Sequence, residues 1–157
     1  MSMASASAAE EPAHDRDVTL LYLIKQVELA VRQSLDDVVA TADLTTIQYT
    51  ALTVLERHPG ITSAELARNS FVRPQTMAEM VTYLLGRGLV TRERDENNRK
   101  QYLLTLSSEG QRVLDDLFDA VADIETRVLH GFDTGQTEIL RTYLLRCRHS
   151  LSGESPR

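Results

Sequence analysis

Residues 62–107 read TSAELARNSFVRPQTMAEMVTYLLGRGLVTRERDENNRKQYLLTLS, and this stretch decides the fold that we predict for the chain. It predicts a short helix, a turn, a second helix and then a charged hairpin of two strands. Pro74 suits the first turn of the second helix, because the N–H that proline lacks would have no partner there. The hairpin tip, residues 95–100, combines turn-forming residues with charges and has no apolar side chain to bury. We therefore expect the tip to project into solvent or onto a partner.

The segments on both sides of this stretch have the apolar periodicity of helices. Thr45 and Thr62 each precede Gln or Glu by three residues, which is the pattern of a capping box at a helix start. The predicted helices cover about residues 18–40, 45–57, 62–69, 74–85, 108–129 and 133–151, and the predicted strands cover 89–94 and 100–106. The predicted fold is mainly α with a small β wing: a winged helix-turn-helix with N- and C-terminal dimerisation helices.

The charge of the chain is unevenly distributed. A formal net charge of −6 over 157 residues at first argues against a nucleic-acid partner. Residues 57–105, however, contain eight Lys/Arg and five Asp/Glu, a local charge of +3, whereas the other residues contain nine and eighteen, a charge of −9. The basic charge therefore lies on the predicted winged helix, and the acidic charge lies on the helices that flank it.

The chain has no predicted targeting or membrane segment. Its single cysteine, Cys147, excludes an intrachain disulfide framework and fits a reducing compartment. No apolar run approaches the roughly 18–20 residues that span a bilayer, and the N-terminus lacks the basic start and apolar core of a signal peptide. We expect a disordered leader over residues 1–15, a frayed tail over 152–157, and a cytoplasmic protein with no membrane partner.

The predicted 74–85 helix has two different sides on a wheel of 100° per residue. Met77, Met80, Val81 and Leu84 share one side, which we expect in the core. The other side carries Gln75, Thr76, Ala78, Glu79, Thr82 and Tyr83. An ordinary exposed helix would carry Glu and Lys there, whereas short hydrogen-bonding side chains and Gln suit close approach to base edges and phosphates. A plain solvated face is the alternative.

Charged residues beside this helix add to the hypothesis of DNA binding. Arg73 stands where Ser, Thr or Asp would cap the helix, and the loss of such a cap costs about 1 kcal/mol. A phosphate or base contact by Arg73 explains its presence, and neutral drift explains it equally well. Glu79 either accepts from a cytosine amino group, pairs with an arginine, or weakens non-specific binding. On the hairpin, Arg94 lies on one arm and Arg99 at the tip, where an arginine suits the narrow minor groove of A·T-rich DNA. A solvated hairpin is again the alternative.

Several short motifs, in order and at the expected spacing, resemble the MarR family of bacterial transcriptional regulators. They are Leu66-Ala67, Thr76, Leu84, Arg87-Gly88-Leu89-Val90, the wing segment 94–100 and the strand-to-helix junction 104–110. The resemblance implies that Gln75, Ala78, Glu79 and Thr82 touch bases or phosphates and that Arg99 is the minor-groove arginine. The chain departs from the family at Asn98, where the family usually has an Asp bracing the wing arginines, and at Arg73, which is commonly Ser.

The same resemblance implies an obligate homodimer, built from the first and the last two helices, that binds a pseudo-palindromic operator in double-stranded DNA. It implies a ligand-responsive repressor more often than an activator. The expected organisation is a single domain over 16–151, with the DNA-binding winged helix at about 45–106 and dimerisation helices at 18–41 and 108–151. A small aromatic or phenolic effector would lodge between these helices and the winged helix, and the candidate lining residues are Tyr22, Gln26, Arg32, Tyr49 and Phe118. Core packing explains the apolar candidates equally well.

Two other functions are compatible with the residues. One is a winged-helix protein-interaction module, favoured by the net charge of −6 and by Glu79. The other is a small-molecule or redox sensor without DNA contact, which would need an exposed Cys147 of low pKa. Cys147 lies in the last predicted helix, whereas the family's peroxide sensors place their cysteine near the start of the first. The histidines show no metal-ligand spacing, and no catalytic grouping or phosphate loop is present, so we expect neither an enzyme nor a cofactor.

Overall fold

The structure, a computed structural model, describes residues 18–152. In chain order its elements are α1 (Leu20–Ala40), α2 (Thr46–Arg57), α3 (Ser63–Asn69), α4 (Pro74–Gly86), β1 (Val90–Arg94), β2 (Tyr102–Leu106), α5 (Ser108–Val128) and α6 (Thr134–Ser152). The predicted leader, 1–15, lies outside the described residues. The predicted tail does so from residue 153 onward, because Ser152 still belongs to α6.

The mainly helical fold with a small wing is confirmed, and the wing strands are shorter than predicted. They pair in antiparallel register from Val90↔Leu106 to Arg94↔Tyr102. Leu89 is excluded from β1 because its N–H donates to the Leu84 carbonyl at 3.0 Å and so completes the end of α4. Gln101 is excluded from β2 because its N–H donates to the Asn98 carbonyl at 2.8 Å, within the turn at the wing tip.

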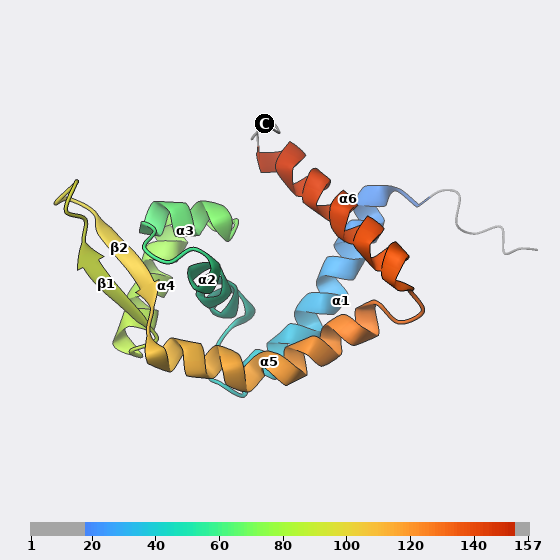
Figure 1. Ribbon diagram of the computed structural model, residues 1–157, viewed down its shortest axis with the longest axis horizontal. Coiled ribbons are helices and arrows are strands. Elements are labelled where there is room, and N and C mark those ends of the chain that lie inside the picture. Colours follow the sequence, from blue (N-terminus) through green and yellow to red (C-terminus); the bar gives the residue numbers. More distant parts are fainter. Residues whose placement is uncertain (1–17, 153–157) are drawn as a thin grey trace, which may run out of the picture.

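Two lobes are joined by the long helix α5 (Figure 1). The winged-helix lobe contains α2, α3, α4 and the two strands of the wing, and the helical lobe contains α1 and α6. Helix α5 starts at the base of the wing, packs against α2 and α1, and leads into α6. The fold therefore places the wing and the start of α1 at opposite ends of the molecule (Figure 1).

The hydrophobic core belongs mainly to the winged-helix lobe. The predicted inner side of α4 is buried as expected, at Met77, Met80, Val81 and Leu84. The largest fully buried side chains of the core are Leu52, Leu55, Leu66, Met77, Leu84, Leu89 and Val39. Val39 comes from the last turn of α1, so this end of α1 is anchored in the core of the winged helix.

The helical lobe leaves its apolar side chains exposed. In α1 these include Leu20, Leu21, Ile24 and Val27, and in α6 Ile139, Tyr143, Leu144 and Leu145. None of residues 134–151 is buried. The apolar faces of α1 and α6 are therefore only partly covered by other residues of the same chain. Within the described residues, no helix is both long enough and apolar enough to cross a membrane.

Both predicted capping boxes are present and set the starts of α2 and α3. The Thr45 hydroxyl accepts from the Gln48 N–H at 3.2 Å, and the Gln48 side chain accepts from the Thr45 N–H at 2.9 Å. Thr62 and Glu65 make the same reciprocal pair. Hydrogen bonds from the Thr62 N–H, and then from its hydroxyl, lower the pKa of the Glu65 carboxyl. The start of α3, beside the wing, is thus held by three local hydrogen bonds between Thr62 and Glu65.

Candidate nucleic-acid interface

Helix α4 presents a polar face that makes almost no contact within the chain. Arg73 is its N-cap and makes no side-chain capping bond. Arg73 and the predicted contact residues Gln75, Thr76, Ala78, Glu79 and Thr82 are all exposed. The hydroxyl of Thr82 donates to the Ala78 carbonyl, one turn earlier, at 3.0 Å. Its hydrogen is therefore used internally, and Thr82 faces outward with its lone pairs.

Tyr83 was predicted on the same polar side but faces a different part of the molecule. Its hydroxyl lies 3.3 Å from the Asp43 carbonyl in the turn between α1 and α2. The α4 residues that remain candidates for DNA contact therefore lie in the first two turns of the helix, together with Thr82. Tyr83 is exposed, as predicted, and makes this contact because it lies near the C-terminal end of α4, where the helix meets the end of α1.

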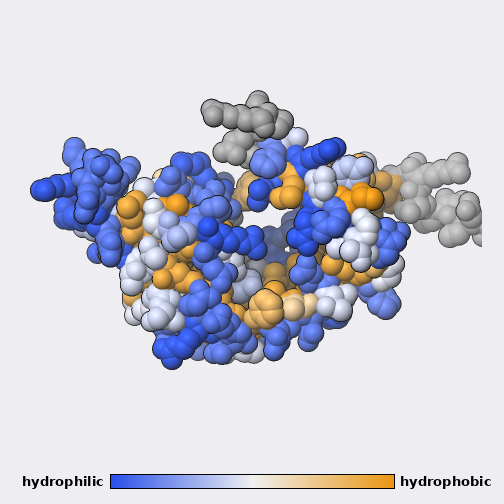
Figure 2. All heavy atoms as spheres, in the orientation of Figure 1, coloured by the Kyte–Doolittle hydropathy of each residue, from blue (hydrophilic) through white to orange (hydrophobic). Residues whose placement is uncertain are grey.

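The wing is braced by arginines that stack on one tyrosine. The guanidinium groups of Arg92 and Arg94 lie over the Tyr102 ring, at 4.7 and 5.4 Å from its centroid. Arg94 also donates to the Arg99 carbonyl at 3.3 Å. These contacts use part of the donor capacity of Arg94, which was predicted as a DNA contact, to stiffen the wing. On the face that Figure 2 shows, the outer part of the wing projects from the lobe as a hydrophilic arm.

The wing tip itself is closed by backbone and Asx-type hydrogen bonds. The Asp95 carboxylate accepts from the Asn97 N–H at 2.8 Å, and the Asn98 side chain accepts from the Lys100 N–H at 3.2 Å. Asn98 therefore orders the tip although it departs from the expected Asp. Within residues 18–152, the Arg99 guanidinium has no hydrogen-bond or ion-pair partner.

A groove of about 400 Å³ connects the polar face of α4 with the wing. Ala78 and Thr82 line it on the side of α4, Arg92 and Gln101 on the side of the wing, and Ser63 at the start of α3. Gln101 and Ser63 were not among the predicted contacts. Nothing in their local sequence distinguishes them, because only the packing of α3, α4 and β2 brings them to one groove.

The five predicted effector residues lie outside the apolar grooves of the helical lobe. A groove of about 470 Å³ runs between α1, α5 and α6 and is lined by residues such as Val31, Leu35, Ile124, Leu140 and Leu144. The five candidates do not line it. Tyr22, Gln26, Arg32 and Phe118 are exposed, and Tyr49 is half-buried, where burial raises the pKa of its phenol. Their assignment to an effector site stays a prediction.

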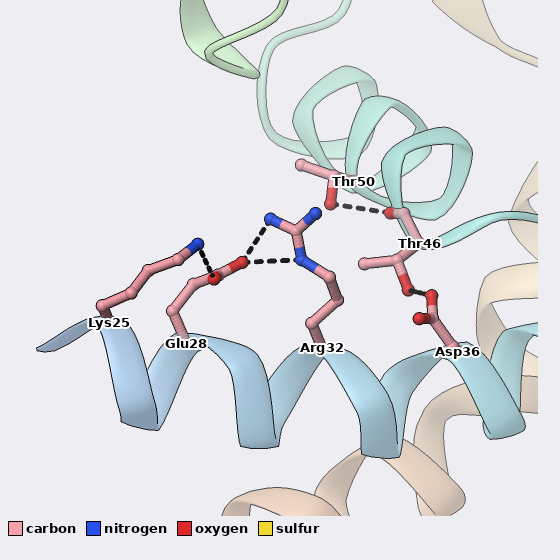
Figure 3. A network of polar contacts seen from close by, with 6 residues as sticks. All are labelled: Lys25, Glu28, Arg32, Asp36, Thr46 and Thr50. Atoms are coloured by element: carbon pink, nitrogen blue, oxygen red, sulfur yellow. Dashed lines mark hydrogen bonds and ion pairs between the residues drawn. The ribbon is translucent and has the colours of Figure 1, made fainter.

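Arg32 is the candidate whose surroundings are best defined (Figure 3). Lys25 and Arg32 bind the same carboxylate, that of Glu28, and the Lys25 contact measures 2.8 Å. Hydrogen bonds from Lys25 and then Arg32 lower the pKa of Glu28. One turn further on, Asp36 accepts from the Thr46 hydroxyl at 2.5 Å and ties α1 to the start of α2. Figure 3 shows Arg32 reaching from α1 toward α2 beside this contact.

Candidate groups for metal or thiol chemistry are few in the part of the chain that the structure describes. No group of three or more His, Cys, Asp or Glu side chains there is arranged to hold a metal ion. Cys147 is a free, exposed thiol on α6. It lies on the helical lobe and not among the residues of the polar face or the wing.

A model of the MarR family matches residues 42–101, which cover α2, α3, α4, β1 and the wing tip and end just before β2. The HTH-type transcriptional repressor Rv2887 of Mycobacterium tuberculosis (strain ATCC 25618 / H37Rv) is 29% identical over 113 residues. That similarity covers 72% of this chain and 81% of the relative. The match to the family model therefore includes α4, β1 and the wing tip of the candidate interface.

Solved structures of similar fold extend the likeness to nearly the whole chain. The transcriptional repressor CouR, bound to a 23-mer DNA duplex, superposes with a TM-score of 0.75 at 26% identity, covering 89% of this chain and 99% of that one. The MarR family protein Rv2887 of Mycobacterium tuberculosis, in complex with salicylic acid, gives a TM-score of 0.67 at 26% identity, covering 84% and 98%. Both lobes and the connecting α5 thus recur together in proteins of similar fold.

Proposed function

Because the chain belongs to the MarR family of winged helix-turn-helix transcriptional regulators, we propose that two copies of it bind a pseudo-palindromic operator. In each copy α4 enters the major groove and the wing reaches the adjacent minor groove. The two half-sites then lie about one helical turn, or 34–36 Å, apart. A small aromatic acid bound by the dimer weakens this binding, so that the protein acts as a ligand-responsive repressor.

One observation carries the proposal: the first two turns of α4 present partnerless polar side chains beside an arginine-tipped wing. Arg73, Gln75, Thr76 and Glu79 are exposed and make no side-chain hydrogen bond or ion pair among the described residues. Side chains that stay unpaired on an ordered helix are available to base edges and phosphates at little cost, because no internal bond has to break first.

The hydrogen-bonding character of this face suits particular base edges. Gln75, at the start of α4, offers a donor and an acceptor, the combination that matches adenine. Glu79 and Thr82 offer acceptors, since the Thr82 hydrogen is bound to Ala78, and acceptors match the amino groups of cytosine and adenine. Arg73 precedes the helix and is placed for a phosphate. The chain's overall charge of −6 then limits non-specific binding.

The wing supplies the first test. Arg99→Ala should weaken operator binding by about 1 to 3 kcal/mol per half-site and leave the free energy of unfolding within about 0.5 kcal/mol, because the guanidinium has no partner among the described residues. The measurement is fluorescence anisotropy with an operator selected from random DNA, at several salt concentrations. Arg57→Ala is the matched control, since Arg57 is an exposed arginine at the end of α2 in the same lobe. If the Arg99→Ala variant and the wild type bound the operator with equal affinity, the proposed contact between the wing and DNA would be wrong.

The homodimer follows from the apolar side chains that the helical lobe leaves exposed on α1 and α6. Exposed apolar surface of this extent is typical of a subunit interface. Two copies joined through these helices would hold their α4 helices at a fixed separation. The palindromic operator mirrors this two-fold arrangement.

We assign the effector's carboxylate to Arg32, which lies between α1 and α2 and already binds one carboxylate, that of Glu28. An aromatic acid can compete for the guanidinium, and the relative Rv2887 bound to salicylic acid shows that this class of ligand binds proteins of this fold. Arg32→Gln should raise the salicylate concentration that releases the operator by about tenfold, as expected for the loss of one charged hydrogen bond. Its affinity for DNA without salicylate should stay unchanged.

Lys25→Gln is the matched control for this test, because Lys25 binds the same Glu28 carboxylate at 2.8 Å and is likewise exposed on α1. If both variants, or neither, change the response to salicylate, the assignment to Arg32 is wrong. The DNA-binding proposal is judged separately, by the anisotropy measurement without ligand.

A further inference from the structure

The arginine of the motif Arg87-Gly88-Leu89-Val90 links the two helices that matter most for operator binding. Arg87 is the C-cap of α4. One terminal nitrogen donates to the Asp43 carbonyl at 3.0 Å and to the Tyr83 hydroxyl at 2.9 Å, and the other donates to the Ala42 carbonyl at 3.2 Å. Tyr83 in turn donates to the Asp43 carbonyl at 3.3 Å. We call this group, Arg87 and Tyr83 on the carbonyls of Ala42 and Asp43, the Arg87 clamp.

The acceptors of the Arg87 clamp belong to a turn that is itself well defined. Residues 41–45 connect α1 to α2, and Asp43 adopts a left-handed conformation with φ 55°. The Leu44 N–H donates to the Val39 carbonyl at 3.1 Å, and both Val39 and Leu44 are buried. The last turn of α1 contains no basic residue. Arg87 therefore brings a positive charge to the negative end of the α1 dipole.

We propose that the Arg87 clamp fixes the angle between α4 and the dimerisation helix α1, and thereby selects the spacing of the two operator half-sites. This inference rests on the proposed function. Arg87 and Tyr83 are positioning residues: they act on DNA through the orientation of α4. The half-buried guanidinium of Arg87 already binds three oxygens of the protein, so it is not available to a phosphate.

The length of α4 makes the angle at its C-terminal end important. Gln75 lies twelve residues before Arg87, which at about 1.5 Å per residue puts it about 18 Å away along the helix axis. A rotation of about 10° at the Arg87 clamp would therefore move the start of α4 by about 3 Å. Neighbouring base pairs are about 3.4 Å apart. A small change of angle thus shifts each α4 by about one base pair along the DNA.

Spacing selection separates this role from a merely structural one. The experiment uses the full-length protein and a set of duplexes that carry the selected half-site twice, with the separation changed by one or two base pairs in each direction. For the wild type we expect one separation to bind best. We define the spacing preference as the affinity for the best separation divided by the affinity for a displaced one. For Arg87→Ala and Tyr83→Phe we expect this ratio to fall, by about tenfold for Arg87→Ala. The preference at each base within a half-site and the salt dependence should stay as in the wild type.

Two further variants complete the test. Arg87→Lys keeps the charge but not the two-pronged donor, so it should recover only part of the spacing preference. Arg57→Ala, which removes an arginine outside the clamp, should keep all of it. If Arg87→Ala does not fold, Tyr83→Phe and Arg87→Lys carry the same test, because each removes part of the clamp and keeps most of the side chain.

The proposal is overturned if the clamp variants lose affinity equally at every separation, which indicates a structural role alone. It is also overturned if Arg87→Ala flattens the salt dependence, which indicates a phosphate contact. Failure of the proposed function looks different: the wild type itself would then bind no selected duplex at moderate salt.

Discussion

Gly88 and Phe71 adopt the same left-handed backbone conformation just after a helix, but only Phe71 has a side chain. Gly88 and Phe71 both have left-handed φ angles, 69° and 54°. Each follows a helix whose last carbonyls are bonded in the same way: Leu89 N–H to Leu84 O after α4, and Val72 N–H to Ala67 O after α3. This Schellman motif favours glycine at the left-handed position, because a side chain there is strained. Phe71 therefore carries this backbone strain, and because the residue is 70% exposed, burial of its ring offsets little of it.

Phe71→Gly should therefore stabilise the protein by about 0.5 to 1 kcal/mol. The substitution relieves the backbone strain, and the larger conformational entropy of glycine in the unfolded chain offsets part of this gain. The net stabilisation corresponds to a rise of roughly 1–4 °C in the melting temperature. The measurement is thermal unfolding at a fixed protein concentration, because a dimer's stability depends on concentration. The control, Gly88→Ala, places a side chain at the matching site and should destabilise. A loss of stability in Phe71→Gly would mean that the ring is buried in the dimer.

At the scale of elements, the wing is attached to α5 through a close backbone contact at Gly110. The Leu89 carbonyl accepts from the Ser107 N–H at 3.0 Å, and the Ser107 hydroxyl donates to the Gly88 carbonyl at 2.6 Å and caps α5. A Cβ on Gly110 would lie 2.2 Å from the Leu89 carbonyl oxygen. The end of α4 and the start of α5 can approach this closely only because residue 110 has no side chain.

Gly110→Ala should therefore destabilise the protein by about 3 kcal/mol, because backbone atoms on both sides have to move. Chemical denaturation measures this change. Gly86→Ala is the control: its Cβ would meet nothing within 4 Å, and alanine is the better helix former, so this variant should be unchanged or slightly more stable. If Gly110→Ala and Gly86→Ala behaved alike, the contact between α5 and the Leu89 carbonyl would not hold the wing in place.

At the scale of the whole molecule, the two lobes differ in how much of their apolar surface is buried within one chain. The winged-helix lobe contains most of the buried core and exposes a few separate apolar side chains such as Phe71, whereas the helical lobe exposes a series of apolar side chains along α1 and α6. Helix α5 connects the two, and the last turn of α1 is buried in the winged-helix core at Val39. Association through the helical lobe therefore determines where each wing and each α4 lies.

Leu144→Glu should shift the protein from dimer to monomer, because Leu144 is 53% exposed on α6 and a charge in an apolar interface is left unpaired. Sedimentation velocity would measure the change in mass. Operator affinity should fall with it, since one winged helix alone binds only half of the operator. Ser150→Glu adds the same charge to a different side of α6 and should remain dimeric. A dimeric Leu144→Glu variant would exclude this part of α6 from the interface.

Local patterns were sufficient to predict the elements of this protein. Capping boxes at Thr45 and Thr62, Pro74 at the first turn of α4, and the polar tip of the wing each depend on residues a few positions apart. The same holds for the buried side of α4, which the helical period of Met77, Met80, Val81 and Leu84 determines. The polar face that carries the proposed DNA contacts is the complement of that buried side, so it too was predictable.

Only the tertiary structure decided how these elements are joined. Arg87 and the carbonyl of Asp43 are 44 residues apart, and no local period relates them. The groove between α4 and the wing needs the packing of three elements, and the space available at Gly110 depends on the carbonyl of Leu89, far from it in sequence. The physical reason is the same in each case. Helix starts and amphipathic faces arise from bonds and periods within one segment, whereas clamps, grooves and close approaches arise where separate segments meet.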